Sequence, residues 1–175
     1  FFYKDKVVAV IGGGNMAVEE AIFLTKFASK VYLIHRRDEL RAEKILQKRL
    51  FENKKIELLW NKQVTDILGE DNPLGVTGIQ IKDTLSKELS EVTCSGVFVA
   101  IGHSPASNLI KNQLKTFDSG YVSTEPGTTK TSIPGVFAAG DLVDNVYRQA
   151  VTSAAMGCMA ALDAERYLSE INNEN

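Results

Sequence analysis

The sequence has little of several features that would quickly narrow its function. Its 175 residues include only two cysteines, Cys94 and Cys158, which are too far apart for a Cys-x-x-Cys pair or for metal-ligand spacing. Because both lie in apolar stretches, we expect two buried thiols in a reducing cytoplasm rather than a disulfide. The sequence therefore predicts no metal site and contains no catalytic dithiol.

Long apolar runs and a strong net charge are also missing. No run approaches the roughly 20 residues of a membrane-spanning helix, and the charged residues 4–6 follow Phe1 and Phe2 too closely for a signal peptide. A formal net charge of -2 gives no overall attraction to nucleic acid or to an anionic membrane. The chain starts without Met, almost directly on an expected strand, which favours a fragment of a longer protein.

The first third of the chain has the pattern of a β–α–β unit. Residues 6–11 form a β-branched run that ends in three glycines, as buried parallel strands do. Helical spacing of apolar residues continues to about Phe27, and residues 30–34 form a second expected strand. Asp38 is predicted to cap a further helix that reaches Leu50.

In the remaining two thirds of the chain the expected secondary structure changes twice, first to short strands and then to a second unit with a long helix. Short strands are expected at 56–60, 64–68, 76–82 and 91–101. They predict an antiparallel meander with its clearest turn at 69–75, after which the parallel sheet resumes at 96–101. A linker at 103–105 leads to an expected strand at 135–139, a helix from about Tyr147 to Leu168 and a disordered tail at 170–175. The predicted fold class is α/β, a Rossmann-like parallel sheet with an antiparallel meander, followed by a smaller α/β unit.

The glycine turn carries the first functional signal. Gly12-x-Gly14-x-x-Ala17 matches the dinucleotide-binding fingerprint. Gly12 allows a tight turn, Gly14 lets the backbone approach a pyrophosphate, and Ala17 lets the helix pack against the strand. The alternative is a plain turn that closes a strand. The strand before it, the helix after it and the second strand at the right distance favour a nucleotide site.

The residues after the second strand indicate which nucleotide binds. NAD sites usually place an acid there, whereas NADP sites place Arg against the 2′-phosphate. This chain has His35, Arg36 and Arg37, with Arg41 one turn further on. Guanidinium groups can bind a phosphate with paired hydrogen bonds, so NADPH is predicted. The alternative, a solvated basic surface, is kept for the later lysines. For both histidines, ligand contact or packing is favoured over base catalysis.

These residues resemble one known family closely. The segments Val8–Asn15, Ala17–Ala21, Ile34–Asp38, Arg41–Leu46, Phe98–Pro105, Thr131–Asp141, Tyr147–Ala150 and Gly157–Leu168 are similar to those of bacterial-type, low-molecular-weight thioredoxin reductases. The resemblance covers nearly the whole chain in unbroken order. It implies an FAD-containing homodimer that passes electrons from NADPH through the flavin to a cysteine pair and then to thioredoxin.

The resemblance also implies which residues contact the cofactors. For NADPH these are Gly12, Gly13, Gly14, Asn15, Met16 and Ala17 at the pyrophosphate, His35, Arg36, Arg37 and Arg41 at the adenosine phosphate, and Ile101 and Gly102 beside the nicotinamide half. For FAD they are Gly140 and Asp141 at the ribityl-pyrophosphate region and Arg148, Gln149 and Ala150 at the isoalloxazine. The helix that follows would direct its N-terminus at the flavin. The alternative for Gly140-Asp141 is a capped turn.

Two departures from the family limit what the resemblance implies. Met16 stands where the family usually has Ser or Thr, so backbone donors alone would hold the pyrophosphate at that point. The Cys-x-x-Cys and the first half of the FAD domain would precede Phe1. We therefore expect an NADPH domain at 1–104, a carboxy-terminal FAD segment at 105–175, and no turnover by the chain alone. Two alternatives are a thioredoxin-reductase-like ferredoxin–NADP reductase and a non-catalytic NADPH-binding module.

Overall fold

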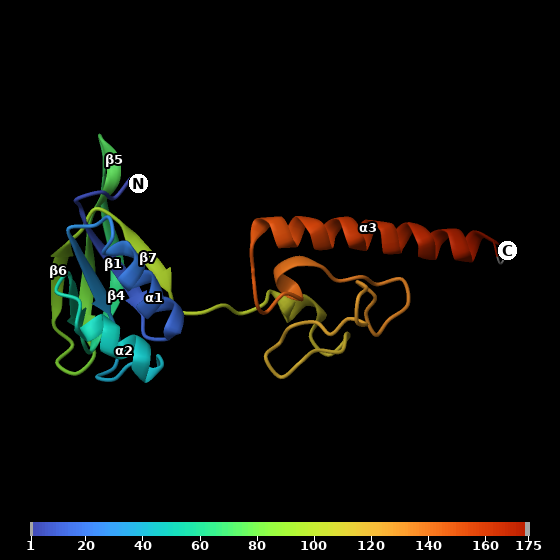
Figure 1. The fold of residues 1–175 in the computed structure, drawn as a ribbon, viewed down its shortest axis with the longest axis horizontal. Helices are drawn as coiled ribbons and strands as arrows, with labels where there is room; N and C mark the ends of the chain where they lie inside the picture. The colour runs from blue at the N-terminus through green and yellow to red at the C-terminus, as the bar shows by residue number, and fades with distance from the viewer. Residues whose placement is uncertain (1, 174–175) are drawn as a thin grey trace. The chain divides into compact units, whose positions relative to one another are not determined.

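The computed structural model describes residues 2–173, which form two compact units. Unit 1 comprises Phe1–Gly102 and unit 2 comprises His103–Asn175. Figure 1 shows the β-strands in unit 1 and the long helix α3 in unit 2. No helix among the described residues is both long enough and apolar enough to cross a membrane.

Unit 1 is built on a parallel sheet with strand order β3-β2-β1-β7. Its strands are β1 (Val7–Gly12), β2 (Lys30–Ile34), β3 (Ile56–Leu59) and β7 (Val97–Ala100). The expectation that 56–60 belongs to an antiparallel meander is wrong, because β3 pairs in parallel with β2. Its apolar residues pack on both faces of the sheet, a two-sided burial that is typical of parallel strands.

A second, antiparallel sheet has the order β4-β5-β6. It consists of β4 (Lys62–Asp71), β5 (Leu74–Asp83) and β6 (Leu89–Thr93). The turn expected at 69–75 is shorter than predicted, because Glu70 pairs with Gly75 and Asp71 with Leu74. The ladder therefore continues almost to the tip, and only residues 72–73 lie between the two strands.

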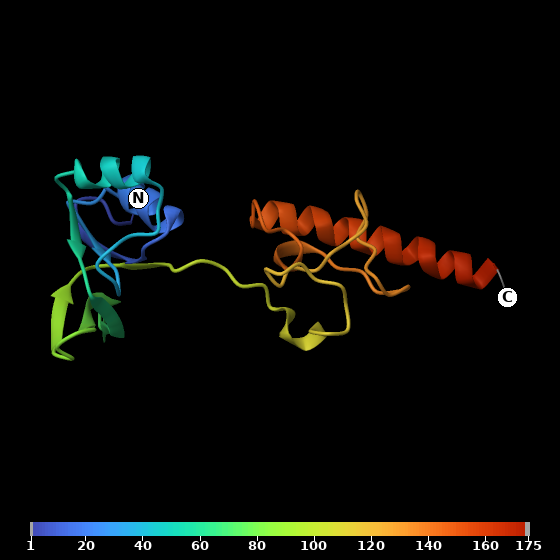
Figure 2. The same cartoon turned by 90° about the horizontal axis from the view of Figure 1, so that it is seen from below.

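Unit 1 has three layers, which can be followed in Figures 1 and 2. Side chains alternate along β1, so Val8 and Val10 face the helices while Ala9 faces the antiparallel sheet. The helix-side core includes Val18 and Leu50, both almost fully buried. The opposite core contains Ile79, Ile81 and Cys94 and joins the two sheets. The parallel sheet is thus packed on both faces, although Val99 on the edge strand β7 stays exposed.

Helices α1 (Asn15–Leu24) and α2 (Lys44–Phe51) are shorter than the apolar spacing predicts. Helix α1 ends at Leu24 rather than near Phe27. The prediction that Asp38 caps α2 is wrong, since the N-cap residue is Glu43. The amides of Arg41 and Ala42 donate instead to the carbonyl oxygen of Gly13, which holds this segment out of the helix.

Unit 2 contains η1 (Ser107–Ile110), η2 (Gly140–Leu142) and α3 (Ala150–Asn173). The strand expected at 135–139 is wrong: within 103–173 there are only isolated bridges, one of which joins Lys130 to Phe137. The helix continues to Asn173, so the expected disorder from 170 is wrong as far as that residue, and residues 174–175 lie outside the described part.

The core of unit 2 is small. It consists of the buried residues Leu114, Val122 and Ala138 with a few partly buried neighbours. Asp163 is the buried residue of α3, and its carboxylate accepts bonds from the amide and hydroxyl of Thr129 at 2.9 and 2.8 Å. Both cysteines are free thiols, but Cys158 on α3 is exposed, so the prediction that it is buried is wrong. Much of the apolar surface of this helix faces solvent.

Candidate functional site

The carboxyl ends of three neighbouring strands meet at one edge of the parallel sheet. Strand β1 ends in Gly12, which pairs with Ala100 of β7, and β2 ends at Ile34 on the other side of β1. The chain order reverses at β1, because later strands lie on both of its sides. In open α/β sheets ligands bind outside the strand ends at such a reversal. The turn, the residues after β2, and Ile101 and Gly102 all lie there.

The three glycines of the turn have different surroundings. A Cβ atom on Gly12 would lie 2.3 Å from the carbonyl oxygen of Ala100 and 2.6 Å from Cβ of Ala17. One on Gly13 would lie 2.2 Å from Cε1 of His35. One on Gly14 would meet no atom within 4 Å. Gly12 and Gly13 therefore allow close packing inside the protein, whereas Gly14 faces open space that a ligand could fill.

The N-terminus of α1 begins at this open side of the turn. Gly14 is its N-cap, no side chain caps it, and its first turn holds no acidic residue. The first amides of a helix have no partner within the helix and carry partial positive charge. The side chain of Met16 packs against the helix-side core. The arrangement leaves backbone N–H groups to hold an anion.

The segment 36–43, which we call the arginine loop, joins β2 to α2. Arg36, Arg37 and Arg41 are exposed. Among the described residues, none of their guanidinium groups has a hydrogen-bond or ion-pair partner. Leu40 and Ala42 are buried in the helix-side core. The loop is therefore anchored by its apolar side chains and presents unpaired positive charges beside the turn.

A polar pair joins the arginine loop to the start of α1. The backbone amide of Glu43 donates to Oδ1 of Asn15 at 2.8 Å, and Nδ2 of Asn15 donates to Oε1 of Glu43 at 3.2 Å. The sequence prediction placed Asn15 among the pyrophosphate contacts and did not single out Glu43. Its acidic side chain directly before the helix 44–51 was a usable signal, because such residues are common at helix starts.

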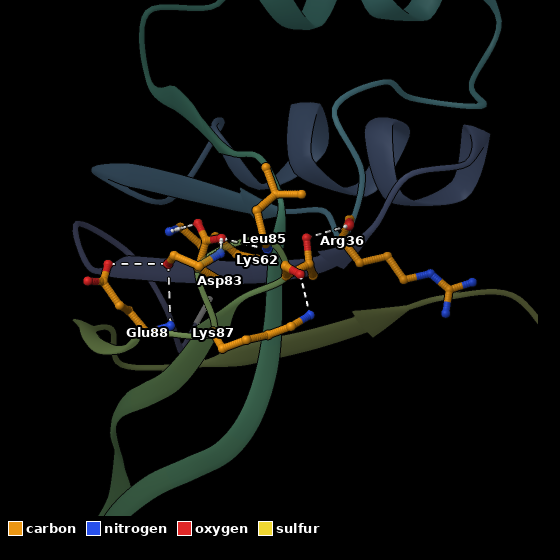
Figure 3. A network of polar contacts seen from close by, with 8 residues as sticks. Arg36, Lys62, Asp83, Leu85, Lys87 and Glu88 are labelled. Atoms are coloured by element: carbon orange, nitrogen blue, oxygen red, sulfur yellow. Dashed lines mark hydrogen bonds and ion pairs between the residues drawn. The ribbon is translucent and has the colours of Figure 1, made fainter.

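The turn between β5 and β6 supports the other end of the arginine loop (Figure 3). The hydroxyl of Thr84 donates to the carbonyl oxygen of Arg36 at 3.4 Å. From the connection between β3 and β4, the amide of Asn61 donates to the carbonyl oxygen of Arg37 at 3.2 Å. Figure 3 also shows the Arg36 side chain extending away from this network. These contacts thus hold the backbone of the loop, while its arginine side chains remain exposed.

Asp83 organises that turn. Its carboxylate accepts bonds from Nζ of Lys62 at 2.7 Å and from the amides of Leu85 and Ser86 at 2.7 and 2.8 Å. The Lys62 hydrogen bond, followed by these two amides, lowers the pKa of Asp83 to about 2. The carboxylate is therefore ionised at any pH at which the protein would work.

His35 lies beneath the glycine turn, away from the exposed arginines. Its ring packs against Gly13 and edge-on to Trp60, with 6.3 Å between ring centroids. Its Nε2 is buried without a hydrogen-bond partner among the described residues. Burial lowers the pKa of His35, and the charges of Arg37 and Arg41 act in the same direction. A neutral, buried ring supports the turn and is poorly placed to hold a phosphate.

In unit 2, Asp141 and Arg148 line one cavity of about 250 Å³. The other lining residues are His103, Ser104, Pro105, Ala106, Tyr121 and Leu142. Gly140 begins the short helix η2, and Oδ1 of Asp141 accepts a bond from the Ser153 hydroxyl at 2.9 Å. The structure thus places Asp141 and Arg148, two of the residues expected at FAD, in one cavity. Residues 103–105, which the sequence pattern predicted to be a linker, also line it.

The sequence prediction missed Asp144, which shapes the segment expected at the flavin ring. Its carboxylate accepts bonds from the amides of Val146, Tyr147 and Arg148, at 2.9, 2.8 and 2.8 Å, and from the Thr152 hydroxyl. Burial alone would raise the pKa of Asp144, but these donors hold it below its ordinary value. An Asp a few residues before a helix was the available signal.

Gln149 and Ala150 lie at the junction of this segment with α3. The amide of Gln149 donates to the Thr152 hydroxyl at 3.2 Å, and α3 begins at Ala150. Arg148 itself has a positive φ of 52°. The amides just before the helix are therefore engaged by protein groups, and a ligand at this end would meet the helix itself and the side chains of 148 and 149.

Comparison with known proteins gives a consistent family. The family model for pyridine nucleotide-disulphide oxidoreductases matches residues 3–157. A thioredoxin reductase of Rickettsia felis is 55% identical over 170 residues, which are 97% of this chain and 55% of that protein. Thioredoxin reductase 2 of Arabidopsis thaliana is 52% identical, over 98% of this chain and 45% of that protein. The chain thus spans about half the length of these relatives.

Solved structures agree with the sequence matches. A thioredoxin reductase from Streptococcus pyogenes superposes with a TM-score of 0.82 at 38% identity, over 97% of this chain and 54% of that one. One from Giardia duodenalis superposes with a TM-score of 0.76 at 40% identity, over 95% and 54%. The predicted fold class, a parallel sheet with an antiparallel meander, is confirmed. With its strand-end glycine turn and its matched residues, the chain belongs to the pyridine nucleotide-disulphide oxidoreductase family.

Proposed function

We propose that unit 1 binds NADPH at the carboxyl edge of its parallel sheet. The main evidence is that the open face of Gly14 and the uncapped start of α1 lie beside three exposed arginines, which have no partner among the described residues. The turn and the helix N-terminus suit a pyrophosphate. Arg36, Arg37 and Arg41 suit the 2′-phosphate that distinguishes NADPH from NADH. Gly12, Gly13 and Ala17 shape the turn, and Ile101 and Gly102 border the nicotinamide half.

His35 changes role in this proposal. The family resemblance implies that it contacts the adenosine phosphate, but its ring is buried against Gly13 and its pKa is lowered. We assign it to the support of the turn. The phosphate contacts are then left to the three exposed guanidinium groups.

We further propose that unit 2 supplies part of an FAD site. Gly140 and Asp141 begin η2, and Asp141 shares a cavity with Arg148, so these residues fit a flavin nucleotide's polar groups. Gln149 and Ala150 lie at the start of α3 beside them. When bound, FAD would accept a hydride from NADPH and pass electrons to a dithiol. This chain's residues would hold and orient the two nucleotides.

The complete protein is proposed to be a homodimeric thioredoxin reductase of the cytoplasm, with thioredoxin as its partner. Residues 1–104 would form the NADPH domain and 105–175 the carboxy-terminal part of the FAD domain. The sequence has no Cys-x-x-Cys, so the dithiol would come from outside this chain. The relatives' names and the two free thiols support the proposal.

Arginine substitution tests the nucleotide assignment. Replacing Arg36 and Arg37 by Ala removes charge-assisted bonds to the 2′-phosphate, so NADPH should bind about 10- to 100-fold more weakly while NADH binding is unchanged. Calorimetric titration of the chain with each nucleotide measures this. Lys48→Ala with Arg49→Ala is the matched control, because it removes the same charge from α2. Equal NADPH and NADH affinities in the wild-type chain would refute the assignment.

The catalytic proposal needs the complete protein that contains this chain. It should be yellow, with flavin absorbance, and should reduce a disulfide dye with NADPH only when thioredoxin is added. A colourless protein, or one that reduces the dye without thioredoxin at the same rate, would contradict the proposal.

A further inference from the structure

We infer that Asn15 and Glu43 are positioning residues that fix Arg41 relative to the phosphate-binding turn and thereby sharpen the preference for NADPH over NADH. The inference rests on the proposed NADPH site and adds a specificity determinant to it. It concerns the two hydrogen bonds between the start of α1 and the end of the arginine loop, which we call the Asn15–Glu43 pair.

The pair closes a short stretch of backbone whose other end is also held. At residue 41 the amide N–H donates to the carbonyl oxygen of Gly13 at 2.8 Å, and Ala42 donates to the same oxygen at 3.2 Å. At residue 43 the amide N–H donates to Oδ1 of Asn15 at 2.8 Å. Residues 41–43 are therefore held through three consecutive amides, two bonded to Gly13 in the glycine turn and one to Asn15 at the start of α1.

Anchoring of this kind matters because the distance between the two phosphate groups of the ligand varies little. The pyrophosphate and the 2′-phosphate of NADPH are joined through one ribose, so the distance between the groups that bind them must match. Arg41 is exposed and its guanidinium has no partner among the described residues. A fixed backbone lowers the ordering cost when that side chain engages a phosphate.

The side chain of Asn15 is itself committed to the protein. Its Oδ1 accepts from the Glu43 amide, and its Nδ2 donates to the Glu43 carboxylate at 3.2 Å. Glu43 in turn is the N-cap of α2 and makes no side-chain capping bond there. Both side chains thus serve the loop-to-helix junction, and Asn15 acts on the nucleotide through the position of Arg41.

Three variants separate hydrogen bonding from charge. Asn15→Ala removes both bonds and should lower the ratio of NADPH to NADH affinity about tenfold. Glu43→Ala removes one bond and should lower the ratio of NADPH to NADH affinity about threefold. Loss of a negative charge near a phosphate would by itself raise this ratio, so the two effects have opposite signs. Glu43→Gln removes the charge but keeps the acceptor oxygen, so the ratio should not fall below wild type. Glu52→Ala is the control for charge on α2.

The readouts are calorimetric titrations of the 175-residue chain and hydrogen exchange at the Glu43 amide. That amide should be protected in the wild type and in Glu43→Gln, and unprotected in Asn15→Ala. Urea unfolding checks that each variant folds, and Glu43→Ala carries the test if Asn15→Ala does not. An unchanged affinity ratio in folded Asn15→Ala or Glu43→Ala, or a ratio that rises in Glu43→Ala, would overturn the inference. A wild-type chain without NADPH preference would overturn the proposed site itself, which is a distinct result.

Discussion

Gly13 and Gly14 are adjacent, yet one faces the protein interior and the other faces open space. A Cβ on Gly13 would lie 2.2 Å from Cε1 and 2.3 Å from Nδ1 of the buried His35 ring. The same atom on Gly14 would meet nothing within 4 Å. In the proposed nucleotide site, the two positions therefore separate the requirements of folding from those of binding, although the sequence motif treats them alike.

Substituting each glycine by Ala should show this separation. Gly13→Ala forces the His35 ring to move and should lower the free energy of unfolding by about 1–3 kcal/mol, measured in urea. Gly14→Ala should leave stability nearly unchanged but weaken NADPH binding, because its Cβ would occupy the open face of the turn. If the clash with the His35 ring causes this loss, Gly13→Ala should cost less stability in a His35→Ala background than in the wild type. An equal cost in both backgrounds would contradict this explanation.

Among the elements, the β5–β6 turn shows how the antiparallel sheet contributes to the site. Asp83 accepts bonds from Lys62 and from two amides of the turn, and Thr84 then reaches the backbone of Arg36. A meander far from the glycine motif in sequence thus supports the loop that carries the arginines.

The ionisation of Asp83 gives this contact a pH dependence. Its pKa is lowered to about 2 from 3.8, so its stabilising effect is complete above about pH 4 and is lost as the pH falls towards 2. The unfolding free energies of wild type and Asp83→Asn should therefore differ at pH 7 and converge as the pH falls below about 2. In Lys62→Met, a carbon-13 NMR titration of the Asp83 carboxyl should show a midpoint shifted towards 3.8. An unshifted midpoint would mean that the Lys62 bond is not the main cause.

Local signals predicted β1, β2 and the start of α1 closely, because a β-branched run, a glycine turn and helical spacing act within a few residues. They could not show that Ile56–Leu59 pairs with β2, since the choice of a strand partner depends on the tertiary structure. The same limit explains why the role of Glu43 was missed, because its amide bonds to Asn15, which is 28 residues away in the sequence. It also explains Cys158, whose exposure depends on what packs against α3.

At the scale of the whole molecule, the two units differ in how much core they contain. Unit 1 has two clusters of buried residues, one on each face of its parallel sheet. Unit 2 has three buried hydrophobic residues in its cluster, and α3 exposes large side chains such as Val151, Leu162 and Leu168. The units should therefore differ in their ability to fold alone.

Expressing the two units separately tests this expectation. Residues 1–102 should unfold cooperatively in urea and bind NADPH within about twofold of the full chain, equivalent to about 0.4 kcal/mol. Residues 103–175 should unfold without a sharp transition and should bind a hydrophobic dye. A sharp transition in the isolated second unit would show that it folds on its own, and loss of nucleotide binding by residues 1–102 would show that the first unit needs the second. Either result would contradict the expectation.

The arginine loop has a consequence for how cofactor choice can change during evolution. Its buried members, Leu40 and Ala42, belong to the helix-side core, whereas Arg36, Arg37 and Arg41 face solvent. If these arginines hold the nucleotide as proposed, inherited substitutions at the exposed positions would alter which nucleotide binds without repacking the interior. In the proposed site, the electron donor would then be exchangeable by a few surface substitutions while the fold is conserved.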